Sequence, residues 1–179
     1  VQGAGGMLFH DGEVLRRLRR IADEFDLLLI FDEIFTGFGR TGNFFAMEGA
    51  GVLPDIVTLS KALTGGVSPL SCAIARSHVF EAFLSDDPAH ALMHGPTYMA
   101  HALGCAAANA SLDLFEDGAW RGHVARIERL LAHGLEPCRN LPGVKDVRTL
   151  GAIGVVELEE APDRAALTEA FAARGAWIR

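Results

Sequence analysis

Two residues that could do chemistry stand at the ends of short apolar runs. Asp32 follows residues 27–31, and Lys61 follows residues 56–59 after a single serine. Lys61 is one of only two lysines in the chain. An amine in a partly desolvated site is a nucleophile for carbonyl carbons. A carboxylate nearby could hold a cationic group of the same ligand.

Both residues also have an ordinary interpretation. A lysine after a strand is usually a surface residue, and an aspartate there often caps a helix or hydrogen-bonds its own loop. Gly65 and Gly66 indicate a turn in which backbone segments approach closely. In doubly wound sheets, ligands bind beyond the carboxyl ends of the strands. We therefore expect Asp32 and Lys61 to converge on one crevice.

The elements that must position this pair follow from apolar periodicity. Residues 12–25 have the 3.6-residue period of an amphipathic helix. Residues 27–31 are wholly apolar, as in a central parallel strand covered on both faces. Further strands are expected at 56–59 and 71–75, with a helix at 77–84. This order predicts an α/β fold with a mainly parallel, doubly wound sheet.

The second half of the chain predicts a change of domain. The Ala-rich segment 101–115 predicts a buried helix, and residues 124–131 carry the apolar stripe of another. Leu141-Pro142-Gly143 ends that helix. Strands at 144–149 and 153–158 and a helix at 164–174 are expected next. We assign 1–140 to part of a large domain with its connecting helix, and 141–179 to the start of a smaller α+β domain.

Composition excludes some classes of function. Half of the 179 residues are apolar and 22% are charged, which is typical of a globular protein. A net charge of −7 and a pI near 5.4 argue against nucleic-acid binding. The one basic cluster, Arg16–Arg20, is expected to be a solvated helix face.

Other features bear on location and completeness. No apolar run approaches the ~20 residues of a membrane span, and no signal peptide is visible. Cys72, Cys105 and Cys138 lack disulfide or zinc spacing, which favours reduced thiols in a cytoplasmic protein. The chain begins with Val1 and stops directly after a strand-like segment. We expect a fragment of a longer protein.

Long motifs surround the two candidate residues. Residues 32–42 read DEIFTGFGRTG, and residues 54–66 read PDIVTLSKALTGG. Both resemble the signature of class III aminotransferases, and so does the spacing of 29 residues between Asp32 and Lys61. The resemblance implies the type I fold of pyridoxal 5′-phosphate (PLP)-dependent transferases. It also implies PLP as cofactor and a homodimer with shared active sites.

The same resemblance implies roles for single residues. Lys61 would hold PLP as a Schiff base and carry protons, and Asp32 would pair with the protonated pyridine nitrogen. Pro96 and Thr97 would contact the PLP phosphate across the dimer interface. The alternative for Thr97 is a hydroxyl that caps a helix beginning near Met99, and both roles could hold because helix N-termini also favour phosphate.

Other stretches are similar to the branch of the family that works in biotin synthesis: residues 1–7, 94–99, 105–112 and 175–179. This similarity implies amino transfer from S-adenosylmethionine to 8-amino-7-oxononanoate, giving 7,8-diaminononanoate. Gly95 would lie against the substrate. Arg179 would bind the substrate carboxylate, for which a planar guanidinium is suited; the alternative is an ordinary terminal residue.

Two other functions remain open. Another class III enzyme acting on ω-amino acids or diamines would share the PLP site, although enzymes for ornithine or 4-aminobutyrate commonly carry Gln where this chain has Phe35. Alternatively, the fragment is a non-catalytic structural piece or dimerisation module, because the resemblance implies that further PLP contacts come from an upstream segment. His101-Ala102-Leu103 also departs from the Asn-Pro or Asn-Ala before Leu that is frequent in the biotin branch.

Overall fold

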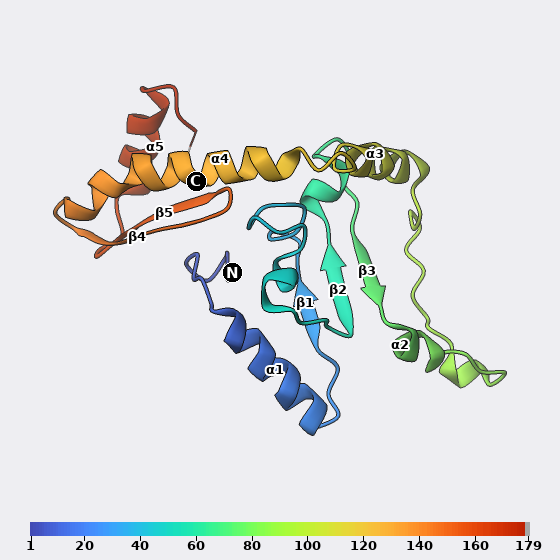
Figure 1. Cartoon of the computed structure of the whole chain (residues 1–179). Helices are drawn as coiled ribbons and strands as arrows, with labels where there is room; N and C mark the ends of the chain where they lie inside the picture. The colour runs from blue at the N-terminus through green and yellow to red at the C-terminus, as the bar shows by residue number, and fades with distance from the viewer. Residues whose placement is uncertain (178–179) are drawn as a thin grey trace.

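The computed structural model describes residues 1–177, which form two sheets linked by a long helix (Figure 1). One sheet has the order β1-β2-β3, and the other is the hairpin β4-β5. The helices and strands are α1 (Gly12–Glu24), β1 (Ile30–Asp32), β2 (Ile56–Leu59), β3 (Cys72–Ala75), α2 (Ser77–Glu81), α3 (Ala102–Asp113), α4 (Trp120–Leu135), β4 (Val144–Leu150), β5 (Ile153–Leu158) and α5 (Arg164–Ala172). Short 3-10 helices are η1 (Ala46–Ala50), η2 (Lys61–Thr64), η3 (Pro88–His90) and η4 (Glu136–Asn140).

The first sheet is mixed. β1 lies parallel to β2, with Ile30 opposite Ile56. β3 runs antiparallel to β2, with Leu59 opposite Cys72. The α/β class is confirmed, but the parallel arrangement holds only for β1 and β2. A parallel return needs a long crossover, usually a helix; the β2–β3 connection, residues 60–71, contains only the short η2, so the chain comes back antiparallel.

The expected central strand at 27–31 is shorter and more exposed than its composition indicates. The strand β1 begins only at Ile30, and residues Leu27, Leu28 and Ile30 are 57%, 56% and 55% exposed. The expectation that both faces of this run are covered is wrong for residues 1–177. An apolar run shows that a strand tends to be buried, but the covering has to come from another element.

An aromatic cluster forms the main core. Phe38, Leu59 and Leu63 are buried, and Phe38 packs edge-to-face on Phe44 with ring centroids 5.5 Å apart. Trp120, the first residue of α4, packs in the same cluster, and its ring centroid lies 6.0 Å from that of Phe44. This contact fixes the start of α4 against the first sheet.

Helix α1 is tied to the sheet by charge. Arg19 Nη1 donates to Asp55 Oδ2 at 2.7 Å, and Arg16 Nη1 donates to the carbonyl of Ala50 at 3.0 Å. The expectation of a solvated basic face is therefore wrong for Arg19, whose side chain is only 18% exposed. The adjacent guanidinium, together with the hydrogen bond from the backbone N–H of Leu29, holds the pKa of the Asp55 carboxyl below its usual range. The sequence did not show that Asp55, 36 residues away, is the partner.

Helix α3 is largely exposed. Gly104 and Ala108 are its buried residues, whereas Leu103 is 75% exposed. The expectation of a buried helix is wrong because, among the described elements, α3 packs mainly on η2 along one side. His101 caps α3, its Nδ1 accepting from the backbone N–H of Gly104 at 3.0 Å. The alternative in which Thr97 caps this helix is also wrong.

The remaining segments are the exposed stretch 80–100 and the helix that packs on the hairpin. Every residue from 80 to 100 is exposed, and Figure 1 shows this stretch lying beyond the edge strand β3. α4 packs along β4 and β5. Within residues 1–177, no helix is both long enough and apolar enough to cross a membrane.

Candidate active site

Asp32 and Lys61 leave the first sheet at the same edge. β1 and β2 are parallel neighbours, and Asp32, the last residue of β1, pairs with Thr58 of β2. The next backbone N–H, of Glu33, donates to the carbonyl of Thr58 at 3.0 Å. Lys61 follows three residues after Thr58. A carboxylate thus ends β1, and an amine follows two residues after the end of its parallel neighbour β2, at the same edge of the sheet.

The backbone of Lys61 is strained. Its φ is +46°, in the left-handed region that favours glycine, at a cost of roughly 1–2 kcal/mol for a residue with a Cβ. The turn is held around it: Ser60 Oγ donates to the carbonyl of Leu70 at 2.7 Å, and Ser111 Oγ donates to that of Ala62 at 3.1 Å. Strain that the surroundings maintain is a recurrent mark of functional sites.

The side chain of Lys61 is exposed and lies over an aromatic ring. Its Nζ is 5.3 Å from the centroid of the Phe35 ring, within reach of a cation–π interaction. The other lysine, Lys145, pairs with Glu157 at 2.6 Å, whereas within residues 1–177 no carboxylate forms an ion pair with Lys61. Its amine is therefore available to a ligand.

Asp32 is also exposed. Its Oδ1 accepts from the backbone N–H of Ile34 at 2.9 Å, which fixes the direction of the carboxylate. The ordinary interpretation, a loop hydrogen bond, is thus correct, and it leaves Oδ2 for a cationic partner. An oriented carboxylate and an unpaired amine at one sheet edge suit a ligand with a protonated ring nitrogen and an aldehyde.

Glu33 organises the loop between these residues. Its side chain is buried, at 2% exposed. It accepts hydrogen bonds from Thr36 Oγ1 and from the backbone N–H groups of Ala46 (3.1 Å) and Met47 (2.8 Å). The carboxylate therefore joins the end of β1 to the start of η1 and closes the loop that contains Phe35. The sequence indicates local hydrogen bonding here, but not that the partners lie 13 and 14 residues on.

The other candidates are not part of this cluster. Gly95, Pro96 and Thr97 are exposed in the 80–100 stretch, and none of their hydrogen bonds reaches Asp32 or Lys61. Arg179 lies outside the described residues. Within the described chain, Asp32 and Lys61 thus lie at the carboxyl ends of neighbouring parallel strands, whereas Gly95, Pro96 and Thr97 lie in the exposed stretch beyond β3.

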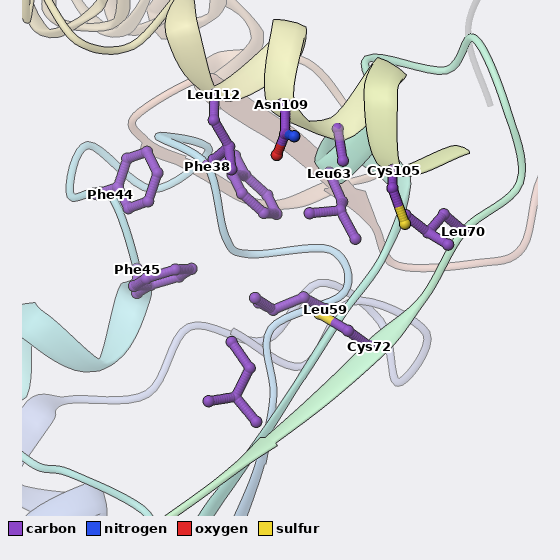
Figure 2. A pocket seen from close by; sticks show the side chains of 12 residues that line it. Phe38, Phe44, Phe45, Leu59, Leu63, Leu70, Cys72, Cys105, Asn109 and Leu112 are labelled. Carbon is purple, nitrogen blue, oxygen red and sulfur yellow. The ribbon is translucent and has the colours of Figure 1, made fainter. Parts of the chain in front are cut away.

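A cavity of about 380 Å³ lies behind η2, between the aromatic cluster and α3 (Figure 2). Apolar side chains dominate its lining, with Asn109, Cys72 and Cys105 as the polarisable or polar exceptions. Burial raises the pKa of the Cys72 thiol. Neither Asp32 nor Lys61 lines this space, so it is separate from the sheet-edge site.

Known proteins are similar to this chain in sequence and fold. The family model described as aminotransferase class-III matches residues 1–179. The adenosylmethionine-8-amino-7-oxononanoate aminotransferases of Corynebacterium glutamicum and Mycobacterium leprae are 46% and 49% identical to the chain over all of its 179 residues. An (S)-enantioselective omega-transaminase from Thermomicrobium roseum covers the whole chain with a TM-score of 0.92 at 32% identity, the match taking in 42% of that protein.

The chain belongs to the class III aminotransferase family. Enzymes of this family use PLP, and the solved structure of ornithine aminotransferase from Toxoplasma gondii, in which PLP partly occupies the active site, superposes with a TM-score of 0.87 at 28% identity. The chain spans 42% and 41% of the lengths of the two curated relatives. The family assignment agrees with the resemblance in the sequence and with the mixed α/β fold.

Proposed function

We propose that the protein transfers the amino group of S-adenosylmethionine to 8-amino-7-oxononanoate, giving 7,8-diaminononanoate for biotin synthesis. The relatives from C. glutamicum and M. leprae carry names with these substrates, and they support the proposal over the full chain. The observation that carries it is the geometry of Lys61: an unpaired amine on strained backbone, at the strand end beside Asp32.

PLP supplies, when bound, an electron-withdrawing ring that stabilises negative charge on the substrate carbon. In this proposal Lys61 Nζ would hold the cofactor through its aldehyde carbon and, once released, would accept and return the proton of the substrate carbon. The Asp32 carboxylate would hold the proton on the ring nitrogen, and its hydrogen bond from the backbone N–H of Ile34 would orient it. Glu33 closes the loop that carries Phe35, whose ring lies beneath Lys61 Nζ.

The remaining residues complete the proposal. Pro96 and Thr97 bind the cofactor phosphate of a second copy in a homodimer, Gly95 lies against the substrate, and Arg179 binds its carboxylate. Exposure of the whole 80–100 stretch, including Met93 at 92% and Tyr98 at 80%, is consistent with a partner surface. We also propose that the enzyme is cytoplasmic.

We propose domain limits of 1–140 and 141–179. The two sheets support this division, because the hairpin β4-β5 shares no strand with the first sheet. α4 then serves as the connecting helix, since it starts in the aromatic cluster and ends against the hairpin.

A second candidate is transamination of another ω-amino acid or diamine. The structural similarity to an omega-transaminase and to an ornithine aminotransferase favours it. Phe35 bears on the choice, because its ring lies at Lys61 Nζ where the amine substrate must arrive.

The experiment is reductive trapping followed by a donor comparison in the full-length protein. We expect borohydride to fix PLP on Lys61, with Lys61→Ala losing the adduct and Lys145→Ala keeping it. S-adenosylmethionine should then be the preferred amino donor over ornithine and 4-aminobutyrate. If PLP is trapped on Lys61 but another amino donor is preferred, the PLP site stands and the second candidate function replaces the first. Absence of an adduct on Lys61 would refute both functions.

A further inference from the structure

Residues 2–8 form a small closed loop near the candidate active site, here called the 2–8 loop. Gln2 and Leu8 pair through two backbone hydrogen bonds of 2.8 and 3.2 Å, and Met7 N donates to the carbonyl of Gly3 at 3.2 Å. Met7 has a φ of +53°. These bonds make the loop one unit, so a force on residues 6 and 7 also acts on Gly3.

One side of the 2–8 loop touches the aromatic ring at the active-site lysine. A Cβ built on Gly3 would lie 3.2 Å from Cδ1 of Phe35, so the glycine backbone packs directly on that ring. Lys61 Nζ lies over the same ring at 5.3 Å from its centroid. Phe35 therefore stands between the loop and the amine.

The other side of the 2–8 loop is held by one side chain of the hairpin. Arg148 of β4 donates through Nε to the carbonyl of Met7 at 3.1 Å and through Nη2 to that of Gly6 at 3.0 Å. Its Nη1 contacts Asp146 at 2.9 Å and Glu157 at 2.5 Å. These two carboxylates orient the guanidinium and raise its pKa. Figure 1 shows the N-terminal loop below the β4-β5 hairpin, where these bonds join them.

We propose that Arg148 is a positioning residue for Lys61, acting through the 2–8 loop and the ring of Phe35. The contacts form an unbroken series from the hairpin to the amine. A planar guanidinium can reach two backbone carbonyls and two carboxylates at once, which an ammonium on a flexible stem does not reproduce. The hairpin thereby sets the position of the Lys61 amine. This role rests on the proposed function, because the same amine is the one assigned to PLP.

The test compares the reactivity of the two lysines in the full-length protein freed of bound cofactor. PLP with borohydride, and separately acetic anhydride, are applied, and peptide mass mapping gives the rates at Lys61 and Lys145. We expect Arg148→Lys to lower the PLP trapping rate at Lys61 on the order of tenfold, since displacements near 1 Å have large effects on reaction rates. The acetylation rate at Lys61 should change as well, and both rates at Lys145 should stay within about twofold.

Two further variants separate positioning from general damage. Gly3→Ala, which disturbs Phe35 from the other end of the series, should reproduce the loss, and the double variant should add little because both act through one path. Arg139→Gln is the control for general damage to the hairpin: it removes ion pairs with Asp146 at 3.4 Å and Glu136 at 3.5 Å and a hydrogen bond to the carbonyl of Val147 at 2.6 Å. Within residues 1–177, Arg139 has no hydrogen bond to the 2–8 loop.

The outcomes are distinguishable. Unchanged Lys61 rates in Arg148→Lys, equal losses at both lysines, or an equal loss in Arg139→Gln would each overturn the positioning role. If PLP fails to mark Lys61 in the unaltered protein, the proposed function fails, while acetylation still tests the positioning. Additive losses in the double variant would show two separate paths and would also contradict the proposal.

Discussion

Replacement of Asp55 by Asn removes one charge from the buried anchor of α1. Asp55 Oδ2 accepts from Arg19 Nη1 at 2.7 Å and from the backbone N–H of Leu29 at 2.8 Å. Its side chain is 7% exposed. On the other oxygen, His78 lies at 3.3 Å and Arg76 at 3.9 Å, but both side chains are more than half exposed. The perturbation therefore falls mainly on the Arg19 pair.

The magnitude follows from the burial of the two partners. Breaking a buried pair costs about 3–5 kcal/mol when the other charge stays buried. Arg19 keeps 18% exposure and a second partner, Asp23, at 2.7 Å, so the lower end applies. We expect Asp55→Asn to lower the free energy of unfolding by about 3 kcal/mol. Asp23→Asn, at a side chain 64% exposed, is the matched control and should cost under about 1 kcal/mol.

The dependence on pH gives a second readout. Arg19 lowers the pKa of Asp55 from its ordinary value of 3.8 in the folded protein. The stabilisation is therefore complete above the unfolded pKa and is lost as pH falls through the folded pKa. Urea unfolding should show a gap between the unaltered protein and Asp55→Asn that is constant from pH 5 to 7 and shrinks in stronger acid. A gap that persists in acid, or one no larger than for Asp23→Asn, would refute this reasoning.

Three other substitutions test backbone strain, hydrogen bonding and close packing around the candidate site. Lys61→Gly should be more stable than Lys61→Ala by about 1 kcal/mol in urea unfolding, because glycine removes the left-handed strain; equal stabilities would contradict the strain. Glu33→Ala should cost about 3 kcal/mol or more in the same assay, because the buried hydroxyl of Thr36 and two partly buried backbone N–H groups lose their acceptor, and Glu48→Ala on exposed surface should cost little. Gly151→Ala, with φ +55° and a Cβ that would lie 2.6 Å from the carbonyl oxygen of Arg40, should lower the melting temperature by several degrees; an unchanged melting temperature would contradict this close approach.

Local signals in the sequence were enough for much of the fold. Turn residues and apolar periodicity placed the strands at 56–59 and 153–158 at their observed limits. They placed the helices within a few residues, because these patterns depend on neighbours close in the chain. Asp32 and Lys61 were predictable as a pair for the same reason: each follows its own strand, and the motif around each is continuous.

Tertiary structure decided what depends on distant partners. The direction of β3, the exposure of residues 27–31 and the burial of Arg19 against Asp55 were not predictable, because each depends on an element far away in the chain.

The series from Arg148 to Lys61 is the clearest case. Its first contact joins Arg148 to the backbone carbonyl of Met7, 141 positions away. A backbone carbonyl is the same in every residue type, so the sequence does not indicate this partner. The sequence by itself determined the two candidate residues, Asp32 and Lys61, through the continuous motifs around them. Only the tertiary structure decided that the 2–8 loop packs between the hairpin and the ring under Lys61 Nζ, because hydrogen bonds to main-chain oxygens depend on where the backbone lies and not on which side chains it bears.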